Sequence, residues 1–302
     1  MTVTLLILTL NEVDGMKKVM PQIKNEWVDE IILVDDCSPD DSWNTIEGIA
    51  KEGKSIYGIR LSRNFGQHIA IVAGLERSIG NRVVVMDCDL QDDPREIKNL
   101  YVKAKEGFHI VYAQRVNRRD PMFKVIMSKV FYKILGYLTD TRLDASVSNF
   151  GIYHRKVIDA VLSMKEGHKI FSIMVRWVGF SSSSIHVLHA SRKYGKSSYS
   201  FRNLIKMSIG IVTSFSDKPL RLMIKIGFMV AFISGVYALF LIYNGVINQV
   251  DVYGWSSVMV SMWFIGGVLM SIIGVVGLYV GRTFDEVKSR PVFILDKNTE
   301  KF

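Results

Sequence analysis

Carboxylates crowd the segment "VVVMDCDLQDDP", residues 83–94, where an apolar run ends. Asp87 and Asp89 are separated by one residue, so at the end of a strand both can direct hard oxygens toward one divalent cation. Gln91 can add a neutral oxygen. We therefore predict a Mg²⁺ or Mn²⁺ site at Asp87, Asp89 and Gln91 that also holds a diphosphate.

The two aspartates that follow fit a different role. Asp92 and Asp93 precede Pro94, and proline is favoured in the first turn of a helix, so both are typical of helix capping. A calcium-binding EF-hand is excluded, because the segment lacks the glycine and the closing glutamate of that loop.

Apolar runs of strand length recur through the first 115 residues and alternate with helical stretches. The expected strands cover residues 3–10, 30–36, 55–61, 82–89 and 109–115, and the expected helices cover Val13–Asn25, Asp41–Lys51, Phe65–Ile79 and Pro94–Glu106. Strands that are apolar on both faces and alternate with helices indicate a mostly parallel sheet that helices cover on both sides. The predicted fold class is therefore α/β, with a Rossmann-like sheet.

Polar residues follow the expected strands at one edge of this sheet. Asn11 and Glu12 follow the first strand, Asp36 ends the second, and Asp87 and Asp89 end the fourth. Ligands of such sheets bind beyond the carboxyl ends of the strands, so we expect these side chains to face one crevice. No GxGxxG follows the first strand and no GxxxxGK[ST] occurs, so the usual signals of dinucleotide binding and P-loop hydrolysis are missing.

The last third of the chain has a composition that suits the interior of a lipid bilayer. Between Ile226 and Gly281 only Asp251 is charged. Because about 20 apolar residues cross the hydrocarbon core of a bilayer, we predict two membrane spans, at about Leu222–Tyr243 and Ser257–Gly281. Two buried helices of a soluble protein are the alternative.

Basic residues flank this pair of spans, while the link between the spans has no Lys or Arg. They are Lys218, Arg221, Lys225, Arg282, Lys288 and Arg290. By the positive-inside rule, both ends of the pair face the cytoplasm, so we expect a multi-pass protein of the inner membrane. The N-terminal segment lacks a basic leader, and the first 200 residues should stay cytoplasmic. Anionic lipid explains the net charge of +9, and we expect no nucleic-acid partner.

The sequence predicts three regions. Residues 1–200 form a cytoplasmic domain, residues 201–218 an amphipathic helix in the membrane interface, and residues 219–302 the two spans with a short cytoplasmic tail. A core helix of the soluble domain is the alternative for the middle region. Small residues in "GGVLMSIIGVVG" predict a homo-oligomer in the bilayer.

The chain resembles the membrane-bound polyprenyl-phosphate glycosyltransferases, the group that includes dolichol-phosphate mannose synthase and bactoprenol glucosyltransferase. The likeness covers nearly the whole chain and is carried by five motifs in order, "TLNE", "ILVDDCSPDDS", "LSRNFGQHIAIVAGL", "DCDLQDDP" and "RKYGKSSYSFRNL". It implies a GT-A fold that transfers a sugar, with inversion, from a nucleoside diphosphate sugar to a polyprenyl phosphate. It also implies that the transfer depends on Mg²⁺ or Mn²⁺.

The resemblance implies roles for individual residues. Asp87, Asp89 and Gln91 match the metal motif of the family. Asp36 matches the position that contacts the nucleoside, and Glu12 matches an acidic residue near the nucleotide. A turn or helix cap is the alternative for Asp36, and a structural role is the alternative for Glu12.

Two basic segments suit the phosphates of the reaction. The departing diphosphate gains negative charge, which cations in a water-poor site stabilise. The segment "SRKYGKSSY" can supply them from Arg192, Lys193 and Lys196. The segment "AQRVNRRDP" can clamp the acceptor phosphate through Arg115, Arg118 and Arg119, with Arg115 favoured because it lies nearest the strand end. Solvated basic surface is the alternative for both segments.

One position departs from the family pattern. Many relatives carry an acidic residue, proposed as the catalytic base, before a Phe in the segment that matches "DASVSNFGIYHRK"; here Asn149 occupies that position and Asp144 lies five residues earlier. A phosphate monoester with a second pKa of about 6 is already largely ionised at pH 7, so its oxygen needs little help from a base. Asn149 can instead orient the acceptor or the sugar, and Asp144 can still approach the site.

We therefore predict transfer of glucose or a related hexose, from a UDP-linked donor, to undecaprenyl phosphate. A transferase that glycosylates a hydroxyl of a lipid-linked saccharide or glycolipid is the alternative within the enzymes, and it would need a true base. A non-catalytic membrane scaffold that binds nucleotide sugar is the alternative from another class.

Overall fold

The computed structural model describes ten parts of the chain. They are residues 2–23, 27–53, 55–89, 91–116, 136–137, 147–167, 169–188, 212, 216–248 and 254–299. Most of the predicted interfacial helix at 201–218 lies outside the described residues. The chain divides into two compact units, of which the larger contains the N-terminal sheet and the tail from Arg290, and the smaller contains two long helices.

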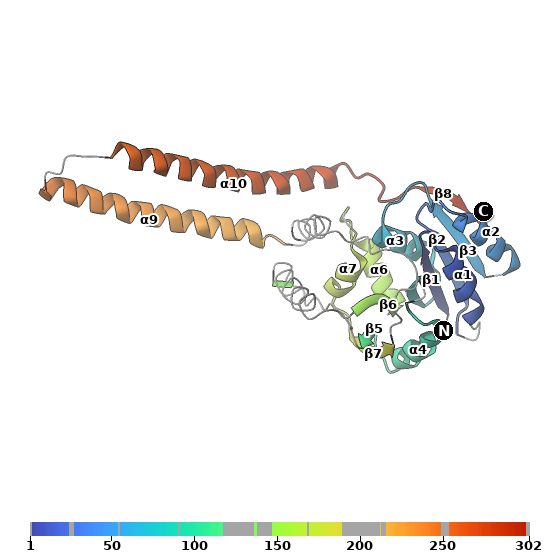
Figure 1. The fold of residues 1–302 in the computed structure, drawn as a ribbon. Coiled ribbons are helices and arrows are strands. Elements are labelled where there is room, and N and C mark those ends of the chain that lie inside the picture. The colour runs from blue at the N-terminus through green and yellow to red at the C-terminus, as the bar shows by residue number, and fades with distance from the viewer. Residues whose placement is uncertain are drawn as a thin grey trace. The chain divides into compact units, whose positions relative to one another are not determined.

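The larger unit is built on one mixed sheet, which has eight strands in the described part of the chain (Figure 1). The strands lie in the order β7-β5-β6-β4-β1-β2-β3-β8. Their bounds are β1 Val3–Thr9, β2 Glu30–Asp35, β3 Ile56–Leu61, β4 Arg82–Asp87, β5 Ile110–Val116, β6 Val147–His154, β7 Ser182–Leu188 and β8 Leu295–Asn298. Strands β1 to β4 are parallel to one another, as are β5 and β7, whereas β6 and β8 pair antiparallel with their neighbours. The predicted α/β fold is confirmed.

Helices cover both faces of this sheet (Figure 1). They are α1 Val13–Val19, α2 Ser42–Glu52, α3 Gln67–Arg77, α4 Ile97–Lys105, α6 Arg155–Ser163 and α7 Phe171–Trp177, with short 3-10 turns η1 Met20–Gln22 and η2 Pro94–Glu96. Leu5 and Ile7 of β1 belong to the same buried cluster as residues of α1, α2 and α4. The intervening Leu6 faces α3, where it lies against Gly74. This alternation explains why β1 is apolar throughout, because both of its faces are buried.

The first predicted helix is shorter than expected. It was predicted over Val13–Asn25, but α1 ends at Val19 and the chain continues as the 3-10 turn η1. Pro21 explains the early end, because proline lacks the N–H that an α-helix needs and crowds the preceding turn.

The C-terminal tail returns to the sheet, an arrangement that the sequence did not predict. Strand β8 pairs antiparallel with β3, and the pairing joins Arg60 to Lys297 and Ile59 to Asn298. Two further main-chain bonds extend it, because the Ser62 N–H donates to the carbonyl of Ile294 at 2.9 Å and the Thr299 N–H donates to that of Gly58 at 3.0 Å. The tail is therefore part of the same folded unit as the N-terminal strands.

The smaller unit contains α9 Lys218–Asn248 and α10 Trp255–Val287. Both helices are long and apolar enough to cross a membrane, and the apolar stretch of each is not buried within the described structure. They lie side by side, since the Tyr279 hydroxyl of α10 donates to the carbonyl of Ser216 just before α9, at 2.7 Å.

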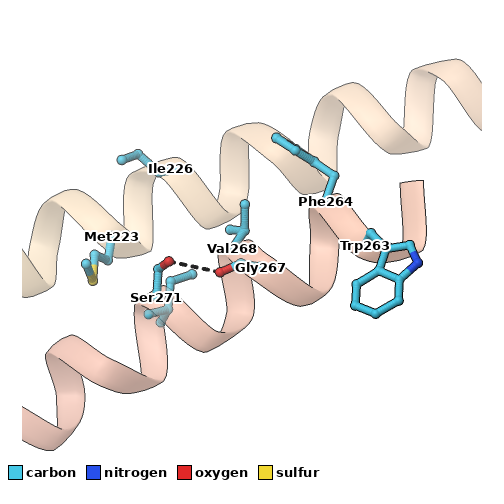
Figure 2. Close-up of a pocket in the computed structure, with 8 residues that line it drawn as sticks. Met223, Ile226, Trp263, Phe264, Gly267, Val268 and Ser271 are labelled. Carbon is cyan, nitrogen blue, oxygen red and sulfur yellow. Dashed lines mark hydrogen bonds between the residues drawn. The ribbon is translucent and has the colours of Figure 1, made fainter. Parts of the chain in front are cut away.

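A groove of about 460 Å³ runs between α9 and α10 (Figure 2). Met223 and Ile226 line it from α9, and Trp263 and Phe264 line it from α10. The one hydroxyl in the wall, that of Ser271, donates to the carbonyl of Gly267 at 2.9 Å. The helix backbone thus satisfies this hydroxyl, as an apolar surrounding requires.

Candidate active site

The carboxylate of Asp87 ends β4 at the carboxyl edge of the parallel strands, as predicted. It is half-buried and accepts the side-chain amide of Gln67, whose Nε2 lies 2.7 Å from Oδ1 and 2.8 Å from Oδ2. Gln67 is the first residue of α3. Gln67 could not be predicted from the sequence, because a single glutamine at the start of a helix carries no signal of its own.

Asp36 follows β2 at the same edge and is 3% exposed. Its Oδ1 accepts the N–H of Phe65 and its Oδ2 accepts the N–H of Gly66, each at 2.8 Å. Gly66 has φ = +97°, a conformation that glycine adopts at little cost, and its carbonyl starts α3. Burial raises the pKa of Asp36, and the two N–H groups partly offset this rise. Asp36 therefore shapes the segment before α3, and a contact of Asp36 with the nucleoside remains a prediction.

Three predicted acidic residues lie close together around the buried Cys88. Burial raises the pKa of the Cys88 thiol far above its ordinary value, and Glu12, Asp89 and Asp87 add to the rise through their negative charges. Helix α1 can lie this close to Cys88 because residue 15 is a glycine. A Cβ on Gly15 would lie only 2.3 Å from the carbonyl oxygen of Cys88. Glu12, at the start of α1, is thereby brought beside the metal motif.

Within the metal motif, the side chain of Asp89 accepts a hydrogen bond from the main chain. The main-chain N–H of Gln91 donates to Oδ1 of Asp89 at 3.1 Å, and Asp89 and Gln91 are both half-buried. The prediction that Asp93 caps a helix is confirmed. Asp93 is the residue before η2, and its carboxylate accepts the N–H of Arg95 at 2.9 Å.

The donor set fits a divalent ion that a ligand helps to hold. Among the described residues, no group of three or more His, Cys, Asp or Glu side chains is arranged to hold a metal ion. Asp87 and Asp89 offer carboxylate oxygens, which Mg²⁺ and Mn²⁺ prefer, and Mg²⁺ is commonly bound by one or two carboxylates together with substrate phosphates. The residues present thus suit an ion that completes its coordination with a bound diphosphate.

Asn149 lies in β6, next to the strand that carries the metal motif. The antiparallel pairing of β4 with β6 reaches Val85 and Gly151, so Asp87 lies two residues beyond the paired part of β4 and Asn149 lies two residues before that of β6. The register of β6 with β5 shifts between Gly151 and Val147, so β6 is irregular around Asn149. The residue that replaces the expected carboxylate therefore lies at the same end of the β4–β6 pair as Asp87.

A buried tyrosine holds the backbone of Asn149. The hydroxyl of Tyr153 donates to the carbonyl of Asn149 at 3.0 Å. The ring of Tyr153 is fully buried and packs edge-on against Phe171 of α7 and Tyr112 of β5, with ring centroids 5.0 and 6.2 Å apart. This contact fixes the start of β6 at the edge where Asp87 ends its strand.

A second buried carboxylate, Asp35, organises the neighbouring loops. It is fully buried, lies 3.3 Å from Nε of Arg60, and accepts the N–H of Ser38 at 2.9 Å. The hydroxyl of Ser38 in turn accepts the N–H of Asn11, which has φ = +57°. The turns after β1 and β2 are therefore tied together.

The remaining predicted residues are only partly described. The backbone of Arg115 pairs with Val187 inside β5, which extends to Val116. The other predicted residues, Arg118, Arg119, Asp144, Arg192, Lys193 and Lys196, lie outside the described residues. Their roles stay predictions.

The mostly parallel sheet, with acidic residues at the carboxyl edge of β1, β2 and β4, defines a glycosyltransferase domain of the GT-A type. The model of glycosyl transferase family 2 matches residues 4–162, and the chain belongs to this family. The chain is therefore an enzyme of the glycosyltransferase class, and the resemblance described above is confirmed.

Relatives match over most of their length. The chain is 34% identical to the uncharacterized glycosyltransferase YkcC of Bacillus subtilis, over 94% of this chain and 87% of the relative. It is 32% identical to the undecaprenyl-phosphate 4-deoxy-4-formamido-L-arabinose transferase of Klebsiella pneumoniae, over 89% and 83%. It is 31% identical to the prophage bactoprenol glucosyl transferase homolog of Escherichia coli, over 89% and 88%. The crystal structure of a mycobacterial protein shares the fold, with a TM-score of 0.50, 16% identity and coverage of 70% and 73%.

Proposed function

We propose that the protein transfers a hexose from a nucleoside diphosphate sugar to a polyprenyl phosphate at the cytoplasmic face of the membrane, with inversion at the sugar. One observation carries the proposal, namely that Asn149, and not a carboxylate, lies near the start of β6, at the end of the β4–β6 pair where Asp87 ends β4. Relatives named as undecaprenyl-phosphate and bactoprenol transferases support this acceptor.

A phosphate acceptor suits this arrangement of residues. Its oxygen is already an anion near pH 7, so it can attack the sugar without a general base. The amide of Asn149 can donate to and orient such an oxygen but cannot take a proton from it. A hydroxyl acceptor would need a base, and among the predicted residues Asp144 is the one left for that role.

The donor diphosphate is proposed to bind at the acidic turn. A divalent ion bound there would supply positive charge to the departing diphosphate. Asp87 and Asp89 would hold the ion, with Gln91 beside them, and Glu12 and Asp36 would lie toward the nucleotide. Arg192 and Lys196 are proposed to add positive charge at the diphosphate, and Arg115, Arg118 and Arg119 to bind the acceptor phosphate. UDP-glucose is the preferred donor, because one relative is named as a bactoprenol glucosyl transferase homolog.

The two long helices are proposed to anchor this domain in the membrane. Strand β8, which follows α10, belongs to the same sheet as the strands that precede α9. If the helix pair spans the membrane, the chain before and after it lies on one side, which supports the proposal of two spans with both flanks in the cytoplasm, in agreement with the positive-inside rule. Gly267 and Gly274 of α10 have no atom within 4 Å of an added Cβ, which leaves room for close contact with another copy in a homo-oligomer.

The choice of acceptor group tests the proposal. Purified full-length protein in detergent is given UDP-glucose and Mn²⁺ with either undecaprenyl phosphate or undecaprenol. We expect glucose on the phosphate lipid alone, in a linkage that mild acid cleaves. Transfer to the alcohol, or to a lipid-linked saccharide in place of both, would favour the hydroxyl-directed enzyme.

A further inference from the structure

The contact between Gln67 and Asp87 has an unusual symmetry. A single nitrogen, Nε2, lies at nearly equal distances, 2.7 and 2.8 Å, from the two oxygens of the carboxylate. The amide therefore sits between the oxygens. A cation that a carboxylate holds through both of its oxygens lies in this same region, because it too is attracted equally to both. The amide and such a cation cannot occupy it together.

We propose that Gln67 competes with the divalent cation for the carboxylate of Asp87, so that binding of the ion displaces the Gln67 side chain. The inference rests on the proposed metal dependence of the enzyme. In the absence of the ion, the amide hydrogens partly compensate the negative charge of Asp87 within the acidic group around Cys88. When the ion binds, its charge takes over this compensation.

The displacement needs only a side-chain movement. Gln67 is exposed, and its side chain has room to rotate into solvent. The backbone beside it is held separately, because the N–H groups of Phe65 and Gly66 stay bonded to the buried Asp36. The segment 65–66 can thus keep its conformation, and with it the start of α3, while Gln67 leaves Asp87.

The competition lowers the affinity for the ion, because the contact with Gln67 must be broken first. Gln67→Ala removes the competitor and leaves the carboxylate in place. We expect the Kd for Mn²⁺, measured by electron paramagnetic resonance of free Mn²⁺ with the full-length protein and UDP, to fall about tenfold. This corresponds to about 1.4 kcal/mol, close to the lower value for a hydrogen bond to a charged group.

Two further variants make the result specific. Asn99→Ala removes a similar amide–carboxylate contact, that of Asn99 with Glu96 at 2.7 Å on α4, and should leave the Kd unchanged. Gln67→Glu sets a second carboxylate beside Asp87, so without metal its thermal midpoint should fall below that of the wild type, and Mn²⁺ should restore it.

Two results would overturn the competition. Equal Kd values for the wild type and Gln67→Ala would show that the amide has no effect on binding of the ion. Weaker binding by the variant would show that the amide orients Asp87 for the ion. These outcomes would leave the proposed function standing. A wild-type protein that binds no Mn²⁺ even with UDP would contradict both the competition and the proposed metal dependence.

Discussion

The hydroxyl of Tyr153 donates a hydrogen bond of 3.0 Å to the main-chain carbonyl of Asn149, four residues earlier in β6. Tyr153 is buried in the aromatic cluster of β5 and α7. The core of the domain thereby holds the start of β6, at the end of the β4–β6 pair where Asp87 lies.

Tyr153→Phe should slow the reaction more than it weakens donor binding. The ring still fills its site, so the free energy of unfolding should fall by only about 1 kcal/mol. Loss of the hydrogen bond to Asn149 should loosen the start of β6 and lower kcat, while KM for the nucleotide sugar should change less. Tyr101→Phe is the control, because the Tyr101 ring lies in α4 and packs on Trp27 at 5.6 Å. An unchanged kcat in Tyr153→Phe would show that the contact has no role in the site.

Asp89→Asn should abolish sugar transfer and preserve the fold. The amide keeps the shape of the side chain and one oxygen acceptor, but it removes the charge that would hold the ion. We expect kcat to fall by at least about 100-fold. Asp93→Asn, which changes a helix cap in the same turn, should retain most of the activity. Full activity in Asp89→Asn would contradict the metal assignment.

Asp36→Asn should change the pH dependence of stability. Burial raises the pKa of Asp36 in the folded state, so the carboxyl contributes stability that is present below its unfolded pKa and is lost as the pH rises through its folded pKa. Near pH 7 the wild type therefore bears the cost of a buried charge that the variant lacks.

Thermal unfolding of the two proteins across a pH series measures this effect. The stability of Asp36→Asn relative to the wild type should be greatest near neutral pH. It should decrease as the pH falls toward the pKa of the buried carboxyl. A relative stability that increases as the pH falls would contradict the direction of the shift.

Removal of the tail from Ile294 onward should weaken the domain. It would expose the edge of β3 and break the bonds of Ser62 and Gly58 with the tail. We expect the thermal midpoint to fall by roughly 5 °C or more. A shorter truncation that removes only residues 300–302, which follow β8, should behave like the wild type. Equal midpoints for the two truncations would show that β8 adds no stability.

The sequence predicted the central sheet well, because strands that are buried on both faces are apolar along their whole length. Strands β1 to β5 all lie within a residue or two of their predicted bounds. Strand β8 was missed for the opposite physical reason. Its residues "LDKN" form an edge strand with two exposed members, and no hydrophobic pattern marks such a strand.

Within the site, the strand ends were predictable but the partners of the carboxylates were not. Asp87 could be placed because it ends an apolar run. Its contact with Gln67 and that of Asp36 with Gly66 span 20 and 30 residues of sequence. Such contacts depend on how β2, β4 and α3 pack, and local patterns do not encode them. The place of Asn149 at the same end of the β4–β6 pair as Asp87 likewise follows from antiparallel strand pairing, which local patterns do not encode.

Transfer of radiolabelled sugar is the most direct test of the account. Purified full-length protein is given a panel of UDP- and GDP-sugars with undecaprenyl phosphate, in the presence of Mn²⁺ or of a chelator. We expect that one donor, UDP-glucose or a related UDP-hexose, labels the lipid and that the chelator abolishes the labelling. Labelling that persists in chelator would contradict the metal site, and absence of labelled undecaprenyl phosphate with every donor would contradict the acceptor.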